Sequence, residues 1–228
     1  MSENIYLDYR SPEIRGLLHG VAPKGFAKVK NEVVPVWVKP IRLLENLTPE
    51  AKNRNRATEI TKHDPSVEIL SDVFDGWVLV RLADGAVGWV EMKQLERVDH
   101  PTRPHEILLT PKEFVERYLG VPYMRGGTTR EGIDCSGLMQ RYFSQVRGMV
   151  IPRHSTDQWK AGVPVQESER QHDDLLNLRH REGTTDHVGL FLTQNEILHA
   201  CLDREGVVVE SLSEVQKRYD ILGTTRLS

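Results

Sequence analysis

The amino-acid sequence predicts an α+β protein in which a small β-barrel domain precedes a domain of helices packed on an antiparallel sheet. Short runs rich in β-branched and aromatic residues occur between residues 33 and 92, which indicates the barrel. A polar, proline-containing stretch at residues 98–106, VDHPTRPHE, interrupts the apolar pattern as a linker does. Beyond it, helical patterns come first and alternating strand patterns follow, which is typical of an α+β domain. The predicted parts are an N-terminal arm, a barrel, a linker and a C-terminal domain, at residues 1–30, 31–98, 99–106 and 107–228.

The composition is that of an ordinary globular protein, with 39% hydrophobic and 28% charged residues among 228. Its 30 Lys and Arg against 33 Asp and Glu give a formal net charge of −3, so we expect neither nucleic acid nor a membrane as a partner. Two cysteines make no disulfide framework and fit a reducing compartment. The first residues show no basic start followed by an apolar core, so we expect no secretory signal and a cytoplasmic location. The sequence does not determine the oligomeric state, for which a monomer is our expectation.

The strands expected in the N-terminal part are short. They are VVPVWV, VEIL, GWVLVRL and VGWVEM, at residues 33–38, 67–70, 76–82 and 87–92. The last two flank ADGA, which predicts a hairpin. The polar segment from Glu45 to Ser66 predicts a long loop, and residues 1–30 are too few for a second barrel, so we expect them to form an arm.

The segment TPKEFVERYLG at residues 110–120 carries the signals of a helix. Thr110 can cap its first turn, Glu113 can complete a capping box, and Gly120 can end it. The stripe expected to be buried consists of Phe114, Val115, Tyr118 and Leu119. From residue 183 onward, the runs HVGLFLT, EILHA, GVVVES and ILGTTRL predict the strands of the antiparallel sheet.

Cys135 lies in GIDCSGLMQRYF, residues 132–143, at the expected start of another helix. Asp134 is a suitable N-cap, and apolar residues follow at helical spacing. Backbone N–H groups and the positive end of the helix dipole would favour a thiolate over a thiol here, and could hold an oxyanion. On this local pattern alone, Cys135 is either a nucleophile or an inert, half-buried cysteine.

A base for this nucleophile is predicted from DHVGLFLTQNEILHA, which forms a hairpin with two histidines. If the loop is residues 193–195, Leu192 faces Glu196 and His199 faces Gly189. His187 and His199 are then diagonal neighbours on one face of the sheet, whereas a two-residue loop would place them on opposite faces. One imidazole can act as general base while the second fixes its tautomer, although another group could take that orienting role.

Five segments of the C-terminal part together resemble the NlpC/p60 family of cell-wall cysteine peptidases. They are GVPYMRGGTTREGIDCSGLMQRYF, IPRHSTDQW, DDLLNL, DHVGLFL and ILHA. The resemblance covers residues 107–228 and implies a papain-like core with Cys135 as nucleophile, His187 as general base and His199 as the orienting residue. It implies no metal or other cofactor.

The resemblance also implies roles around the nucleophile. Tyr123 matches a tyrosine near the oxyanion site, and the positions that match residues lining the substrate groove are Asp134, Ser136, Arg153 and Ser155. Two departures stand out: Arg125 replaces the usual tryptophan, and HDDLLNL replaces the usual PGDLVFF. The first changes one wall of the groove, and the second is expected to affect a turn and strand packing.

The run GWVLVRLADGAVGWV resembles the end of bacterial SH3-like domains, over residues 31–98. Trp77 and Trp89 within it are either core aromatics or ligand-binding residues. Family members with such a domain and no signal resemble cytoplasmic enzymes of cell-wall recycling. The expected substrate is therefore a free murein peptide, L-Ala-γ-D-Glu-diaminopimelate, cut at the γ-D-glutamyl bond. The alternatives are an exported hydrolase of intact peptidoglycan, an acyltransferase or amidase with the same site, and a non-catalytic peptide-binding module.

Overall fold

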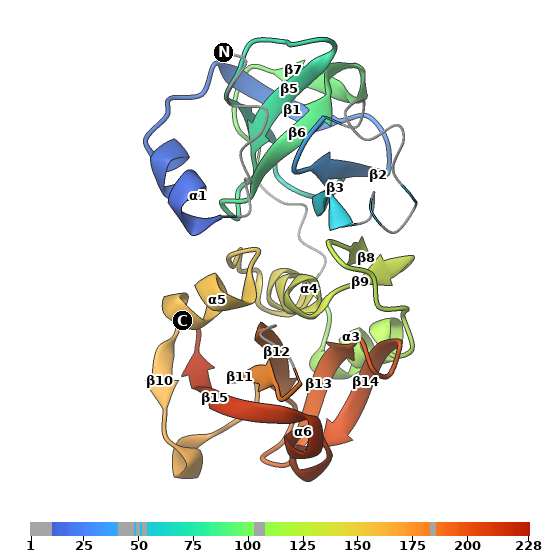
Figure 1. The fold of residues 1–228 in the computed structure, drawn as a ribbon, viewed down its shortest axis with the longest axis vertical. Helices are drawn as coiled ribbons and strands as arrows, with labels where there is room; N and C mark the ends of the chain where they lie inside the picture. Colours follow the sequence, from blue (N-terminus) through green and yellow to red (C-terminus); the bar gives the residue numbers. More distant parts are fainter. Residues whose placement is uncertain (1–10, 41–47, 49–50, 52–53, 103–107, 183–185) are drawn as a thin grey trace. The chain divides into compact units, whose positions relative to one another are not determined.

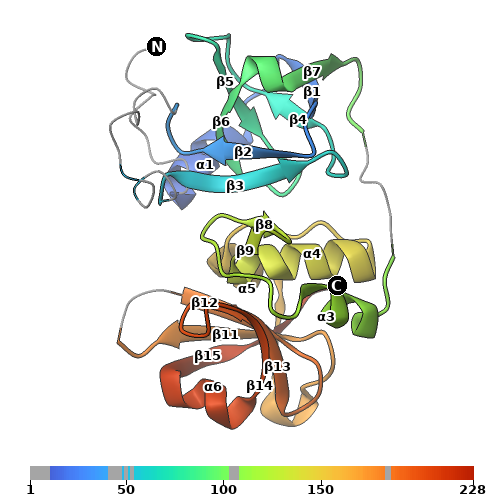
Figure 2. The same cartoon turned by 90° about the vertical axis from the view of Figure 1, so that its right-hand side faces the viewer.

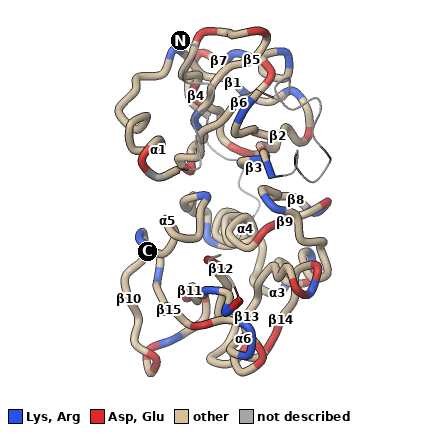
Figure 3. Tube along the Cα trace, in the orientation of Figure 1, with Lys and Arg blue, Asp and Glu red and all other residues tan. Residues whose placement is uncertain are grey.

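A computed structural model describes residues 11–40, 48, 51, 54–102, 108–182 and 186–228 of the chain (Figure 1). The chain divides into two compact units, Met1–Glu106 and Ile107–Ser228. Within both units, acidic and basic residues are interspersed along the chain (Figure 3). No helix among the described residues combines the length and the apolar character needed to cross a membrane.

The described residues of the N-terminal unit include helix α1 (Pro12–His19) and a seven-stranded sheet in which neighbouring strands pair antiparallel. The strand order is β3-β2-β6-β5-β4-β1-β7. The strands are β1 (Gly25–Val29), β2 (Val33–Trp37), β3 (Arg56–Thr61), β4 (Val67–Ile69), β5 (Trp77–Arg81), β6 (Val87–Glu91) and β7 (Leu95–Val98), with a 3-10 turn at Met92–Gln94. The predicted hairpin around ADGA is confirmed, because β5 pairs with β6 from Trp77↔Glu91 to Arg81↔Val87.

The three tryptophans of this unit share one apolar cluster. Trp37, Trp77 and Trp89 pack together, and Ile14 and Leu18 of α1 lie against them. Trp77 and Trp89 are only 5% and 4% exposed. Of the two roles considered for these tryptophans, the structure therefore favours core packing.

Two predictions for this unit are wrong. The expected loop at residues 45–66 contains strand β3, whose sequence RATEIT is polar although its middle residues are buried; Glu59 is buried there beside its ion-pair partner Arg56. The expected arm contains strand β1, which pairs with β4 and β7. Among the described residues the sheet ends at β3 on one side and β7 on the other, so a closed barrel stays a prediction.

The expected linker lies partly outside the described residues, which omit 103–107. Its earlier part is tied to the N-terminal unit: the backbone N–H of Ser66 donates to the Thr102 hydroxyl at 3.0 Å, and the N–H of Thr102 donates to the Ser66 hydroxyl at 2.8 Å.

The C-terminal unit is an α+β fold built on a six-stranded antiparallel sheet (Figure 2). The strand order is β10-β15-β11-β12-β13-β14. These strands are β10 (Val163–Val165), β11 (Leu175–His180), β12 (Asp186–Phe191), β13 (Glu196–Cys201), β14 (Gly206–Ser211) and β15 (Tyr219–Arg226). The helices are α3 (Pro111–Tyr118), α4 (Cys135–Arg147), α5 (Ser155–Ala161) and α6 (Leu212–Arg218), with a short ribbon of β8 (Thr128–Thr129) and β9 (Gly132–Ile133) and a 3-10 turn at Glu167–Glu169.

Two apolar clusters lie against this sheet. The larger contains the buried side chains of α3 and α4, among them Phe114, Leu138 and Tyr142, together with Val188 and Leu198 of the sheet. The smaller joins Val215 of α6 to side chains from β11, β12, β13 and β15. Since neighbouring residues of a strand point to opposite faces, the sheet is covered on both sides.

The predicted helix at residues 110–120 is confirmed as α3, including the capping box between Thr110 and Glu113. Phe114 and Tyr118 are buried as expected, and Val115 packs against the same cluster. Leu119 is not part of this stripe. It follows the last helical residue, with extended backbone, and is 55% exposed.

The departure HDDLLNL changes a turn at the start of β11. Asp173 has a left-handed backbone with φ 75°, at the position where the family pattern has glycine; aspartate is one of the few residues that tolerate this region. Its carboxylate accepts a hydrogen bond from Tyr142 and pairs with Arg147, both on α4. The replacement therefore fastens helix α4 to the edge of the turn.

We predict that Leu138→Ala destabilises the C-terminal unit by about 2–5 kcal/mol, because Leu138 is fully buried and its removal leaves a cavity. Leu119→Ala is the matched control and should change stability by less than about 0.5 kcal/mol. Denaturant unfolding followed by hydrogen exchange of peptides from residues 108–228 measures both. Equal effects of the two substitutions would contradict this assignment of the core.

Candidate active site

Cys135 is the first residue of helix α4, and its position is set by the residue before it. Asp134 is the N-cap, and its Oδ1 accepts a hydrogen bond from the Gly137 N–H at 2.8 Å. Its Oδ2 accepts from the Gly126 N–H at 2.8 Å. Gly126 has φ 76°, a conformation that favours glycine, so the loop turns sharply where it meets the helix. The predicted cap and helix are confirmed.

The start of α4 faces a gap in the sheet between β12 and β13. The two strands pair at Leu190↔Leu198 and Phe191↔Ile197, next to their hairpin turn, whereas β12 stays paired with β11 as far as Asp186. The backbone N–H of Val188 lies near the Cys135 sulfur and lowers the pKa of its thiol against the larger raising effects. Because Val188 follows His187 directly, the thiol lies against the strand that carries the expected base.

The two histidines meet as predicted. The register of the hairpin is confirmed by two contacts: Leu190 pairs with Leu198, and the Leu192 N–H donates to the Glu196 carbonyl at 2.9 Å. His187 Nε2 and His199 Nδ1 are 2.8 Å apart and hydrogen-bonded. Gly189 makes room for this contact, since a Cβ there would lie 3.4 Å from the His199 Cβ and 2.6 Å from Ile197. Because His187 Nε2 is engaged with His199, Nδ1 is the His187 ring nitrogen that could accept the Cys135 proton.

Burial controls the charge of both reacting groups. Cys135 and His187 are 8% and 7% exposed. Burial, followed by the nearby Asp134 carboxylate, raises the pKa of the Cys135 thiol to about 12. Burial, with the charge of Arg218 as a smaller cause, lowers the pKa of His187 well below its ordinary value. The expected thiolate is therefore not favoured at rest: the helix end and its N–H groups do not outweigh desolvation, and the resting pair is a thiol beside a neutral imidazole.

Tyr123 lies close to the thiol. Its backbone is bridged to Ile133, two residues before Cys135. Burial, followed by repulsion from Cys135 and Asp134, raises the pKa of the Tyr123 hydroxyl. It therefore stays protonated at neutral pH, as a hydrogen-bond donor must be if it is to stabilise an oxyanion.

Three of the residues expected in the substrate groove form a buried network behind the nucleophile. Arg153 donates to both oxygens of Asp134, at 2.9 and 2.7 Å, and to the Ser136 hydroxyl at 2.8 Å. Asp134, Ser136 and Arg153 are 8%, 7% and 3% exposed. The charge of Arg153 and these hydrogen bonds oppose the effect of burial and hold the pKa of Asp134 below its usual value. The network joins the loop, the helix start and the segment before α5.

The remaining predicted residue, Ser155, opens helix α5 and is partly buried. One turn later, Gln158 donates to the Ser136 carbonyl at 3.0 Å and to the Pro152 carbonyl at 2.8 Å. Helix α5 is thus attached to the first turn of α4. Arg125, which replaces the usual tryptophan, is exposed, and its charge acts on Tyr123.

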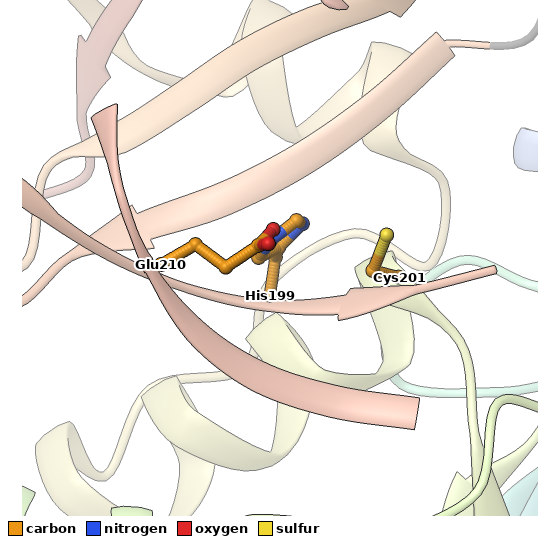
Figure 4. Close-up of side chains that lie close together, drawn as sticks. All are labelled: His199, Cys201 and Glu210. Atoms are coloured by element: carbon orange, nitrogen blue, oxygen red, sulfur yellow. The ribbon is translucent and has the colours of Figure 1, made fainter. Parts of the chain in front are cut away.

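The histidine pair continues into residues that the sequence analysis did not identify. His199 Nε2 is hydrogen-bonded to Glu210 Oε2 at 2.9 Å, and Figure 4 shows this carboxylate directed at the ring from the neighbouring strand. The ring of Tyr219 stacks on that of His187, with centroids 4.7 Å apart and planes 17° apart. The strand alternation of GVVVES could have indicated Glu210, which is two residues from Val208, the partner of His199. Tyr219 comes from β15, and no local pattern places it there.

His199, Cys201 and Glu210 offer ligand atoms within 4.8 Å of one another, so their geometry alone would suit a metal ion (Figure 4). The charges around them favour hydrogen bonding instead. Arg204 donates to Glu210 Oε1 at 2.9 Å, and Arg218 pairs with Oε2. A cation bound here would lie beside two guanidinium groups, so we assign this cluster to the support of the histidine pair.

We predict that alkylation of Cys135 by iodoacetamide accelerates about tenfold per pH unit between pH 7 and 10. The thiolate is the reacting species, and below its pKa of about 12 its fraction grows tenfold per unit. Peptide mass spectrometry after timed quenching follows Cys135, with the fully buried Cys201 as internal control. A rate that is already constant between pH 7 and 8 would contradict the raised pKa.

We also predict that Arg153→Met destabilises the C-terminal unit by about 3–5 kcal/mol, because it leaves the buried Asp134 carboxylate without its cation. The matched control is Arg179→Met, which removes an ion pair with Asp186 from a half-exposed arginine and should cost at most about 1 kcal/mol. Thermal and denaturant unfolding of the whole chain measure both. A cost for Arg153→Met no larger than that of the control would show that the network is not structural.

Comparison with known proteins gives a consistent result for the C-terminal unit. Residues 120–226 match the model of the NlpC/P60 family. A murein DD-endopeptidase/murein LD-carboxypeptidase, MepS, of Escherichia coli is 38% identical over 103 residues, which cover 44% of this chain and 54% of that protein. A γ-D-glutamyl-L-lysine dipeptidyl-peptidase of Bacillus cereus is 26% identical over 181 residues, covering 77% and 52%. The chain thus spans about half the length of these curated relatives.

A crystal structure of an NlpC/P60 family protein from Bacillus cereus aligns with a TM-score of 0.46 at 21% identity, over 92% of this chain and 66% of that one. The sequence matches support the prediction of a cysteine peptidase. Residues 120–226 therefore carry the NlpC/P60 sequence pattern, and the segment includes Cys135, His187 and His199.

Proposed function

We propose that this protein is a cysteine peptidase that hydrolyses peptidoglycan stem peptides at the bond between the γ-carboxyl of D-glutamate and a diamino acid. The observation that carries the proposal is the buried His187–His199 pair, hydrogen-bonded at 2.8 Å, with the Cys135 thiol near the backbone N–H of Val188, the residue after His187. The relatives named above act, by their names, on murein peptides and γ-D-glutamyl bonds, which supports the substrate class.

The reaction would begin from the neutral pair. As the Cys135 sulfur attacks the γ-carbonyl carbon, its proton passes to His187 Nδ1 and a tetrahedral oxyanion forms. The Tyr123 hydroxyl and the backbone N–H groups at the start of α4 are the donors available to that oxyanion. The imidazolium then gives its proton to the amine of the diamino acid, which leaves, and a thioester remains. Water, deprotonated by His187, releases the acyl group and restores the thiol.

We further propose that the substrate is a free murein peptide with an unblocked N-terminal L-alanine, and that the protein acts in the cytoplasm during cell-wall recycling as a monomer. The N-terminal unit is proposed to be an SH3-like domain. This refinement is supported by the match to the Bacillus cereus dipeptidyl-peptidase, which extends over 77% of the chain. The same site on intact peptidoglycan, or with an amine in place of water, would give the exported hydrolase or the acyltransferase.

We predict that the wild-type protein converts L-Ala-γ-D-Glu-diaminopimelate into L-Ala-D-Glu and free diaminopimelate, and that Cys135→Ala and His187→Ala reduce the rate at least about 10³-fold. Mass spectrometry of timed digests identifies the products, and the L-lysine peptide tests the diamino acid. Folding of both variants is checked by their thermal unfolding. Activity that survives in Cys135→Ala would overturn the mechanism.

Three further digests separate the alternatives. A peptide with an acetylated L-alanine should be cut at least about tenfold more slowly if the free amine is recognised. Cleavage of intact sacculi without cleavage of the free peptide would overturn the recycling assignment. Transfer of the acyl group to an added amine in preference to water would identify an acyltransferase.

A further inference from the structure

We propose that Glu210 is a positioning residue whose carboxylate, acting through two imidazoles in series, fixes His187 in the tautomer that presents an unprotonated Nδ1 to Cys135. The inference deepens the proposed function and, for its kinetic part, rests on it. It starts from three hydrogen-bonding groups in a row, Glu210 Oε2, the ring of His199 and the ring of His187, joined by contacts of 2.9 and 2.8 Å.

The first step concerns the charge of Glu210. Its side chain is 10% exposed and is held by two guanidinium groups, Arg204 on Oε1 and Arg218 on Oε2. The hydrogen bond from His199, followed by those from the two arginines, lowers the pKa of this carboxyl to about 2 against the raising effect of burial. At neutral pH Glu210 is therefore a carboxylate, which can only accept hydrogen bonds. The proton in the bond to His199 must then be on His199 Nε2.

The second step passes this constraint along the chain of rings. A neutral imidazole has one N–H, so a proton on Nε2 makes His199 Nδ1 an acceptor. The Glu210 carboxylate already has two cationic partners, Arg204 and Arg218. His199 Nδ1 thus accepts, and His187 Nε2 must carry the proton of their shared bond. The lone pair of His187 is then on Nδ1, the nitrogen left for the thiol.

Packing fixes the orientation of the His187 ring as well. Tyr219 of β15 stacks on it, and Arg218 lies 5.8 Å from the Tyr219 ring centroid. The other titratable or charged groups that face this region are His180 of β11, whose ring is 5.2 Å from that of Tyr219, and Asp203, which pairs with both His180 and Arg218. A ring held flat in this way cannot turn over to exchange its nitrogens. Its tautomer therefore depends on the hydrogen-bond partner of Nε2.

The direct test is the tautomer itself. In ¹⁵N-labelled protein at pH 7, long-range ¹H–¹⁵N spectra should show His187 and His199 protonated on Nε2. Glu210→Gln should remove this preference, because an amide can also donate and thereby allow a proton on His199 Nδ1. Glu214→Gln is the matched control: it lies on α6, pairs with Lys217 and is 44% exposed, and should leave both rings unchanged. Unchanged tautomers in Glu210→Gln would overturn the proposal.

The kinetic test uses the peptide substrate defined above. Glu210→Gln should lower kcat/KM by about 10- to 1000-fold, within the range that a positioned base contributes. The acid limb of its pH profile should move to lower pH, because the Glu210 charge raises the pKa of His187 against the larger lowering effects. A fall of less than twofold with an unmoved limb would overturn the proposal.

A double-mutant cycle separates positioning from simple support of the fold. His199→Asn places an amide oxygen near the position of Nδ1, where it can accept from His187 Nε2 without help from Glu210. In that background, Glu210→Gln should cost less than threefold in kcat/KM. If Glu210 only stabilises the fold, its replacement will cost the same in both backgrounds.

The results that would contradict the proposed function differ from those that would contradict the role of Glu210. If the protein cleaves none of the peptides but the tautomers respond to Glu210→Gln as expected, the substrate assignment fails and the relay stands. If wild type cleaves the peptide and Glu210→Gln alters neither tautomers nor kinetics, the relay fails and the proposed function stands.

Discussion

Strands β12 and β13 pair only near their hairpin turn, and the candidate site depends on their separation beyond it. Full pairing would direct the Val188 N–H into the sheet. Because the strands part, that N–H is available to the Cys135 sulfur, and the first turn of α4 meets the sheet at the residue next to His187. The same opening leaves space in which two imidazoles from adjacent strands form a hydrogen bond of 2.8 Å. Backbone that the sheet leaves unpaired thus becomes part of the site.

Burial then determines how the site would work. A nucleophile at a helix start is commonly expected to be a thiolate, yet desolvation raises the pKa of Cys135 and lowers that of His187. Neither charge exists until the proton moves, so the surroundings must favour the ion pair at the moment of attack. The Glu210 carboxylate is joined to His187 by hydrogen bonds through His199. Arg204 and Arg218 help to keep this carboxylate ionised. The negative charge that would stabilise the His187 imidazolium therefore lies on Glu210 and not next to the Cys135 sulfur.

Local patterns were sufficient to predict much of this structure. Helix α3 with its capping box, helix α4 with Asp134 as cap, and the register that joins His187 to His199 all follow from spacing and turn length. Strand β3 could not be predicted, because its polar residues are buried through an ion pair between its own side chains.

The outer parts of the site were also hidden from the sequence. Glu210 and Tyr219 reach the histidines from β14 and β15, which are brought there by the fold of the whole sheet. The raised pKa of Cys135 depends on surrounding volume that no local motif describes. Sequence patterns therefore identified the reacting groups, whereas their environment required the tertiary structure.

The placement of His199 and Glu210 depends on the lengths of two turns, the one before β13 and the one between β13 and β14. Surface loops generally accept insertions and deletions. The turn before β13 determines which face His199 occupies, and the four residues between β13 and β14, 202–205, do the same for Glu210. One added or lost residue in either turn would rotate a whole strand by half a period, so relatives that keep this chemistry should vary these turns in composition and hardly at all in length.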